Sequence, residues 1–409
     1  MKINWIENGI CAAKGFKSAG IHSGLRKNKS KKDLALIYSD VMCNVACTYT
    51  QNKVKGAPIT VTKANVKDGK AQAIICNSGN ANTCNANGIE IATKMCKLAA
   101  DSLKLKTEDI IVASTGVIGQ PLDIKPIEDN IDELASLLSN TQKSNFDTCE
   151  AIMTTDTVRK EYALQIEINN KIITIGGIAK GSGMINPNMA TMLSFVTTDC
   201  NITSEVLQQI VSSVVDDTLN MVSVDGDTST NDMYIVMANG LAENNIIADV
   251  NSADAQIFKN ALFELSKQIS KGVAKDGEGA TKLLECTVSN AKNTTIAKLV
   301  AKSVINSSLF KCAIFGEDAN WGRILCAIGY TEAEFDIDKI DVDLKSDAGI
   351  ISVCKNGAGV DFSEEVAKEI LIKDTITVQI NMNDGNAQAT AWGCDLSYDY
   401  VKINGDYRS

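Results

Sequence analysis

Residues 176–193, GGIAKGSGMINPNMATML, constrain the fold more than any other stretch, because glycine, proline and asparagine interrupt both helical and alternating patterns there. The glycines permit backbone angles that other residues avoid, and Pro187 favours an extended conformation at the residue before it. Residues 191–198, TMLSFVTT, are β-branched and apolar, which is typical of a buried strand. We therefore expect a tight bend that places Thr191 at the start of this strand. A glycine-rich hairpin with no chemical role would explain the same pattern.

The chain has 409 residues, of which 44% are hydrophobic, so it can bury a large core in two or three domains or lobes. Its formal charge is −10, and its only basic run, residues 26–32, is expected on an exposed loop. This balance argues against nucleic-acid binding. The first ten residues lack the apolar stretch of a secretory signal, and no run of about 18 apolar residues occurs, so we expect a cytoplasmic protein without a membrane span.

Thirteen cysteines are scattered without a CxxC pair, and the chain has a single histidine, His22. This composition argues against a zinc site, and we expect no bound metal and mostly reduced, buried thiols. A serine or cysteine nucleophile paired with histidine could use only His22, which lies in a basic, loop-like stretch. Covalent catalysis in this chain therefore needs another base.

Apolar residues recur at helical and strand spacings throughout, without a long repeat, which predicts an α/β or α+β fold. Asn169 and Asn170 separate two alternating runs and predict a hairpin. The expected strands are residues 33–38, 45–50, 72–76, 109–114, 162–168, 171–178 and 233–237, and the expected helices include 89–103, 124–138, 144–152, 204–219, 252–271 and 294–305.

Three polar or glycine-rich loops invite other interpretations. AKGSGMI lacks the third glycine of a dinucleotide-binding loop, and TGVIGQ lacks the lysine of a P-loop. Residues 225–232, DGDTSTND, depart from the spacing of a calcium loop, so Asx turns are favoured. We therefore expect no cofactor.

Thr191 becomes an effective nucleophile if it is N-terminal, because its own α-amine then serves as the base. This requires cleavage after Ala190, and an N-to-O acyl shift onto the Thr191 hydroxyl would achieve it. Thr115 and Gly116 end an apolar strand, where two backbone amides could form an oxyanion hole. A simple turn is the alternative at that position.

Several motifs occur together along the chain. They are CNSGNANTC, ASTGVIG, MTTDT, AKGSGMINPNMATML, SVDGDTSTND, KDGEGATK, GEDANWGR and the terminal NGDYRS. In this order they closely resemble the ornithine acetyltransferase / glutamate N-acetyltransferase family of arginine biosynthesis. The differences are small: Ala319 stands where proline is frequent, and Ser409 stands where threonine is also usual.

The resemblance implies a two-lobed α/β sandwich of the self-processing N-terminal-nucleophile type, with the site between the lobes. It implies cleavage between Ala190 and Thr191 into chains 1–190 and 191–409 that assemble as an α2β2 heterotetramer. Thr191 would be the nucleophile, and Thr115 and Gly116 would form the oxyanion hole. The implied substrate contacts are Thr154, Lys180, Thr191, Glu278, Asn404 and Ser409. Thr155 and Thr157 share a loop with Thr154 and remain alternatives to it.

The implied reaction transfers acetyl from N2-acetyl-L-ornithine to L-glutamate through an acetyl-Thr191 enzyme, in a ping-pong cycle. Some family members also use acetyl-CoA, which would then be a substrate. Two alternatives stay open: a self-processing aminopeptidase or amidohydrolase that uses water as acceptor, and a non-enzymatic descendant that keeps the fold.

Overall fold

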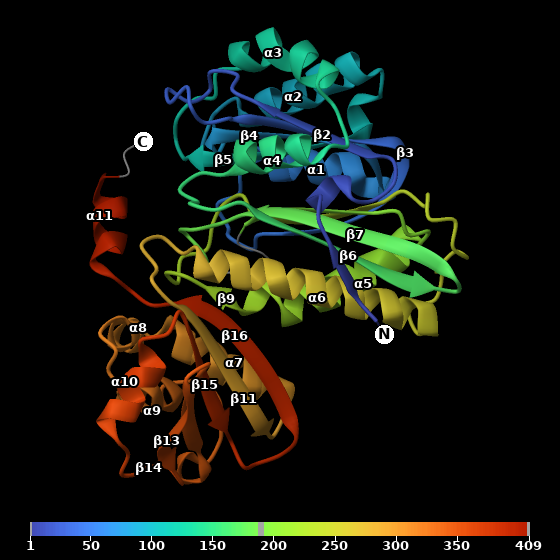
Figure 1. The fold of residues 1–409 in the computed structure, drawn as a ribbon. Coiled ribbons are helices and arrows are strands. Elements are labelled where there is room, and N and C mark those ends of the chain that lie inside the picture. The colour runs from blue at the N-terminus through green and yellow to red at the C-terminus, as the bar shows by residue number, and fades with distance from the viewer. Residues whose placement is uncertain (1, 187–191, 407–409) are drawn as a thin grey trace.

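The computed structural model describes residues 2–186 and 192–406, so Ala190, Thr191 and Ser409 lie outside the described residues. Within the described residues the strands form two sheets (Figure 1). The nine-stranded sheet has the order β1-β6-β7-β8-β10-β3-β4-β5, and β2 also pairs with β3. Its strands are β1 (Asn4–Ile6), β2 (Phe16–Ile21), β3 (Leu34–Tyr49), β4 (Lys70–Asn80), β5 (Ile110–Val117), β6 (Lys160–Ile168), β7 (Lys171–Lys180), β8 (Leu193–Thr198) and β10 (Met233–Ala238).

The second sheet comes from the C-terminal part of the chain and has the order β14-β13-β12-β15-β11-β16-β9. Its strands are β9 (Val222–Ser223), β11 (Leu283–Ala291), β12 (Asp341–Ser346), β13 (Gly349–Lys355), β14 (Ala358–Gly359), β15 (Thr375–Asn381) and β16 (Ala387–Cys394). The α-helices are α1 (Ala57–Asn65), α2 (Gly88–Leu103), α3 (Lys125–Ser136), α4 (Gln142–Ile152), α5 (Ser204–Asp217), α6 (Ala253–Lys275), α7 (Thr294–Asn306), α8 (Ser308–Phe315), α9 (Trp321–Gly329), α10 (Glu364–Leu371) and α11 (Tyr398–Asp406). Short 3-10 helices lie at Gly9–Cys11, Val66–Asp68, Thr107–Asp109, Leu219–Met221 and Ile337–Lys339.

The long strand β3 divides the first sheet into two halves. Its first residues pair with β2 and β4, its last residues pair with β10, and the β3–β4 register shifts between Tyr38 and Cys43. The sequence predicted two separate strands here, at 33–38 and 45–50, and this was wrong. The irregularity bends one continuous strand and does not end it, because pairing with different neighbours holds both halves extended.

The two halves of the first sheet face each other across a buried apolar cluster. Ile74 and Ile111 enter it from the β4–β5 half, and Phe195 and Ile235 enter it from the β8–β10 half. Alternate residues of the same strands point outward, toward α2 and α3 on one side and toward α5 and α6 on the other. Helices thus cover the outer face of each half, which is the α/β sandwich that the resemblance implied (Figure 1).

Helix α6 connects the two sheets. It contacts β6 and β7 of the first sheet, and also β9, β11 and β16 of the second. Figure 1 shows this helix between the green strands above and the red strand β16 below. Its buried residues continue the apolar cluster from one lobe into the other, so both lobes share one core.

The sequence correctly predicted the β6–β7 hairpin and the amphipathic helices. β6 and β7 pair antiparallel, and Asn169 and Asn170 both have positive φ angles, 51° and 60°, as a two-residue hairpin turn requires. The helices expected at 89–103, 204–219 and 252–271 correspond to α2, α5 and α6. Because these signals act over a few residues, they do not depend on the rest of the fold.

The described part of the bend between β7 and β8, residues 181–186, follows directly on the last residue of β7. Lys180 pairs with Leu193, and Leu193 pairs with Met233 of the parallel strand β10. Strands β8 and β10 follow position 190, yet they pair with β7 and β3, which precede it. The predicted division into chains 1–190 and 191–409 therefore runs through one sheet and not between the two lobes.

Candidate functional site

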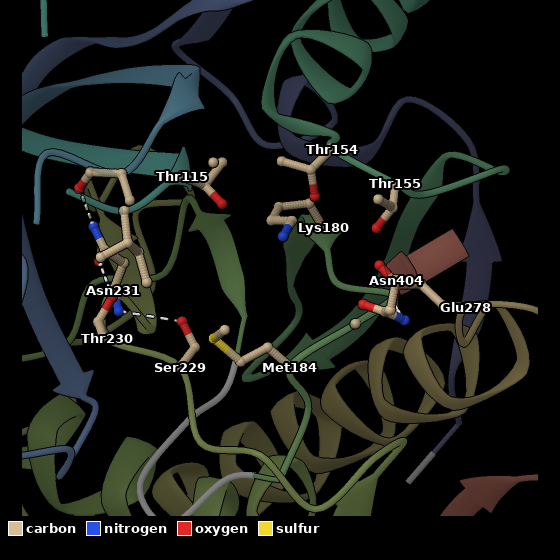
Figure 2. Close-up of a pocket in the computed structure, with 14 residues that line it drawn as sticks. Thr115, Thr154, Thr155, Lys180, Met184, Ser229, Thr230, Asn231, Glu278 and Asn404 are labelled. Atoms are coloured by element: carbon tan, nitrogen blue, oxygen red, sulfur yellow. Dashed lines mark hydrogen bonds between the residues drawn. The ribbon is translucent and has the colours of Figure 1, made fainter. Parts of the chain in front are cut away.

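A cavity of about 150 Å³ opens where the halves of the first sheet meet the loop after α6 and helix α11. Six of the predicted site residues line it: Thr115, Gly116, Thr154, Lys180, Glu278 and Asn404. They come from five separate stretches of the chain, and Figure 2 shows the five of them that it labels, all except Gly116, around one space. His22 lies elsewhere, where its Nδ1 contacts the Lys31 carbonyl at 2.9 Å.

Thr115 and Gly116 form one wall of the cavity. At Gly116 the backbone adopts a conformation that only glycine accommodates. Gly116 ends the regular part of β5 with φ +128°, and a Cβ added there would lie 2.4 Å from the carbonyl carbon of Gly79. The close approach to β4 and the positive φ both exclude a side chain. The β4–β5 register shifts at this point, beside the cavity.

Lys180 is the last residue of β7 and the cavity's cation. In Figure 2 its side chain lies below that of Thr154, between Thr115 and Thr155, and the residue is 8% exposed. Burial lowers the pKa of Lys180, and the negative charge of Asp156, together with that of Glu278, partly opposes that effect. No carboxylate of residues 2–186 or 192–406 forms an ion pair with this ammonium, which makes Lys180 a good receptor for a substrate carboxylate.

Glu278 and Asn404 form the opposite polar wall. The Asn404 amide donates to Glu278 Oε2 at 2.8 Å, so α11 contacts the loop that follows α6. The Glu278 backbone N–H donates to the Ser182 carbonyl at 3.1 Å, which fixes this loop against the bend after Lys180. Gly183 lets the Glu278 carboxylate approach the backbone, because an added Cβ would lie 2.3 Å from that carboxylate and would displace it.

The loop after α4 separates its three threonines. Thr154 and Thr155 line the cavity, whereas Thr157 lies outside that lining and donates its hydroxyl to Asp276. Thr154 and Thr155 therefore remain the candidates for a substrate contact.

Asn231 joins the DGDTSTND loop to the wall at Thr115, and we call this arrangement the asparagine brace. Its Oδ1 accepts from the hydroxyls of Thr83 and Thr230 at 2.5 and 2.6 Å. Its Nδ2 donates to the carbonyls of Ala81 and Ser114 at 2.5 and 3.0 Å. All hydrogen-bonding positions of the amide are occupied, so the brace fixes the backbone directly before Thr115.

Asp225 of the same loop holds the described end of the central bend. Its carboxylate accepts the backbone N–H groups of Met184 and Ile185 at 2.6 and 2.8 Å, and that of Asp227 at 3.2 Å. The expected Asx turn is present, and the loop also binds the bend. Within residues 2–186 and 192–406, no group of three or more histidine, cysteine or acidic residues is arranged to hold a metal ion.

The comparisons with known proteins agree on one family. The family model described as the ArgJ family matches residues 17–409. A curated relative from Caldanaerobacter subterraneus subsp. tengcongensis, named arginine biosynthesis bifunctional protein ArgJ, is 50% identical over 397 residues, which are 97% of each chain. The ArgJ 1 protein of Clostridium acetobutylicum is 49% identical over 395 residues, or 96% of each. The chain belongs to the ArgJ family.

A solved structure supports the same assignment. The crystal structure of the ArgJ protein from Bacillus halodurans is 47% identical, covers 53% of this chain and 100% of the solved one, and has a TM-score of 0.51. Family membership confirms the resemblance inferred from the motifs, the mixed α/β fold and the expectation of an acyltransferase of arginine biosynthesis. It does not favour the aminopeptidase or the non-enzymatic alternative.

Sequence reasoning about this ArgJ-family chain missed three neighbouring residues that line the cavity, Ser229, Thr230 and Asn231. Their motif, DGDTSTND, predicts turns, and nothing local in it indicates that the loop packs against β5. The thiols met expectation: all thirteen cysteines lie in the described residues and are free, and most of them are buried. None of the described helices has the length and hydrophobicity needed to cross a bilayer.

Proposed function

We propose that this enzyme transfers an acetyl group from N2-acetyl-L-ornithine to L-glutamate through an acetyl ester on Thr191. The observation that carries the proposal is the convergence of Thr115, Gly116, Thr154, Lys180, Glu278 and Asn404 on one cavity. Each residue belongs to a motif of the family resemblance. The motifs lie in five distant stretches of the chain, and a common site explains why these stretches meet. Family membership supports the same chemistry.

Thr191 becomes N-terminal by self-cleavage after Ala190, which leaves chains of 190 and 219 residues. The Thr191 hydroxyl attacks the Ala190 carbonyl, and water then hydrolyses the ester that forms. Described residues on both sides of this bond are held firmly. Asp225 binds the backbone at Met184 and Ile185, and the Met192 carbonyl accepts the Met233 N–H at 2.9 Å. These two anchors, one on each side of the bond, support the proposed intramolecular attack.

The first half-reaction follows from the charges around the cavity. Lys180 binds the α-carboxylate of the donor, and Glu278 binds its side-chain ammonium, since each pair is charge-assisted. Thr191 attacks the acetyl carbonyl with its α-amine as base, and the oxyanion forms against Thr115 and Gly116. Ornithine then leaves with the proton that the α-amine returns.

In the second half-reaction glutamate enters the same cavity and its amine attacks the acetyl ester. Its α-carboxylate again binds Lys180, so one receptor serves both substrates. Acetyl-CoA is an alternative acetyl donor in this scheme, and no cofactor is needed. We propose that the two chains assemble as an α2β2 heterotetramer in the cytoplasm, where the free thiols stay reduced.

Intact mass of the purified protein tests the cleavage. We expect two chains that divide after Ala190 in the parent and in Thr191→Ser, and a single uncut chain in Thr191→Ala. Incubation of the parent with N-acetylornithine alone should add one acetyl group to the chain that begins at Thr191, and glutamate should remove it. An uncut parent that still transfers acetyl would contradict the mechanism. Acetate released at the same rate without glutamate would indicate a hydrolase.

A further inference from the structure

A buried ion cluster, outside the residues assigned to the reaction, is hydrogen-bonded to segments that line the cavity. It consists of Asp156, Lys160 and Asp276, whose side chains are 0%, 1% and 6% exposed. The Lys160 ammonium lies 2.7 Å from Asp156 Oδ1 and 2.5 Å from Asp276 Oδ2, and it also donates to the Val158 carbonyl at 3.5 Å. Its three N–H groups are all engaged, so Lys160 has no proton donor left for a substrate.

Asp156 connects this cluster to two substrate contacts. Its Oδ2 accepts the backbone N–H of Thr154 at 2.9 Å. Its Oδ1 accepts the N–H of Gly181, the residue after Lys180, at 2.7 Å. One carboxylate thus fixes the backbone at Thr154 and at the base of the Lys180 side chain.

Asp276 connects the same cluster to Glu278. Its carbonyl accepts the Ser182 hydroxyl at 2.8 Å, and the Ser182 carbonyl accepts the Glu278 N–H at 3.1 Å. Its carboxylate accepts the backbone N–H of Thr157 at 3.1 Å. The segments that carry Thr154, Lys180 and Glu278 therefore meet at one ammonium.

The charges in the cluster do not cancel. Two carboxylates face one ammonium, and the excess negative charge lies near the buried Lys180. The titratable groups around Lys180 come from several elements: Asp156 before β6, Lys160 on β6, Asp232 before β10, Glu278 after α6 and Cys76 on β4. Asp156 is the strongest of the charges that oppose the effect of burial on the pKa of Lys180.

We propose that Asp156 is a positioning residue, which holds Thr154 and Lys180 in place for the substrate and supplies the counter-charge of Lys180. The inference rests on the proposed function, because it takes Lys180 as the receptor of the substrate carboxylate. Burial alone would raise the pKa of Asp156, but Lys160, Lys180 and the hydrogen bonds hold it below the ordinary value. Asp156 is therefore ionised over the whole working range.

The test is Asp156→Asn, assayed by single-turnover acetylation from N-acetylornithine as a function of pH. Loss of the carboxylate charge makes Lys180 lose its proton more readily, so kcat/KM should begin to fall at a pH lower by about 1 unit or more. The side-chain ammonium of the donor titrates identically with both proteins, so the difference between them reports the enzyme. A folded variant whose alkaline limb is unchanged would overturn the proposal.

Asp199→Asn is the matched control. Asp199 is also buried and accepts backbone N–H groups, from Thr174 at 2.8 Å and from Lys14 at 3.3 Å, but it does so near the opposite end of β7. Its replacement should leave the alkaline limb where it is. A shift equal to that of Asp156→Asn would mean that any buried carboxylate of this sheet has the effect, and it would refute a specific role.

If Asp156→Asn shows no cooperative thermal unfolding, and therefore does not fold, the proposal is tested with Asp156→Glu. The charge is kept but displaced by one methylene, so we expect an unshifted alkaline limb and a kcat/KM lower by about 100-fold. Activity equal to the parent would overturn the proposal. Failure of the proposed function is distinguishable, because the parent itself would then form no acetyl-enzyme.

Discussion

The two walls of the cavity are held by opposite physical means. On the Thr115 side the asparagine brace is neutral, and every amide position of Asn231 is satisfied by a hydroxyl or a carbonyl. On the Lys180 side the buried ion cluster uses three charges to hold three loops. A neutral network keeps its geometry at any pH, whereas an ionic one also sets the charge of its neighbours. The wall proposed to stabilise an oxyanion needs only geometry, and the wall proposed to bind charged substrates needs both.

Removing the ammonium from the buried ion cluster should have the largest effect. Lys160→Met leaves Asp156 and Asp276 facing each other without a counter-charge, and we expect the free energy of unfolding to fall by about 3–5 kcal/mol. Urea denaturation followed by circular dichroism measures this loss. A loss below about 1 kcal/mol would show that water or a shifted loop replaces the ammonium, and the cluster would not be the link between the three loops.

Breaking the asparagine brace should cost less stability. Asn231→Ala removes the four amide hydrogen bonds to the Ser114 and Ala81 carbonyls and to the Thr83 and Thr230 hydroxyls, and we expect a loss of about 1–3 kcal/mol. We also expect kcat to fall with no shift of the pH profile, because no charge changes.

The matched control for the brace is Asn239→Ala. Asn239 donates to the Lys14 carbonyl at 2.7 Å and accepts the Leu241 N–H at 3.1 Å, away from the cavity. It should lower stability to a similar degree and leave kcat unchanged. If both variants reduce kcat equally, the brace is a stability element only.

Asp232 contrasts with Asp156, because its buried Oδ2 has no hydrogen-bond partner among the described residues. Burial raises the pKa of Asp232 well above its ordinary value. The folded state therefore keeps a proton that the unfolded state releases above about pH 4. This costs stability as the pH rises toward the folded pKa, with a slope of about 1.4 kcal/mol per pH unit.

Asp232→Asn removes this titration. The variant should gain stability relative to the parent from pH 4 upward, and the two should converge below pH 4. Chemical denaturation at a series of pH values gives the difference. A constant difference across that range would show that Asp232 is ionised in the folded enzyme and paired with Lys180.

The smallest effect is expected for an exposed ion pair with the same sequence spacing as Asp156 and Lys160. Lys97 and Asp101 are four residues apart on α2, 2.7 Å from each other, and both side chains are 63% exposed. Lys97→Ala should change the free energy of unfolding by about 0.3–0.5 kcal/mol, measured by the same denaturation. A loss close to that of Lys160→Met would mean that spacing and not burial determines the strength of these pairs.

The sequence by itself determined two kinds of feature: local structure that arises within a few residues, and site residues that lie in short motifs. Asn169 and Asn170 turn the β6–β7 hairpin by their own tolerance of positive φ, and α2, α5 and α6 follow their apolar periodicity. The motifs also indicate the six cavity residues, since each of them lies in a short, recognisable stretch.

Only the tertiary structure decided how these stretches meet. β3 continues through its irregularity because β4 and β10 pair with its two ends, and neither neighbour is adjacent in sequence. The same holds for Thr157, which contacts Asp276 and not the cavity, and for Asn231, whose partners are up to 150 residues away. A side chain's role in this enzyme depends on which distant backbone packs against it. No local pattern in the sequence shows which distant segment that is.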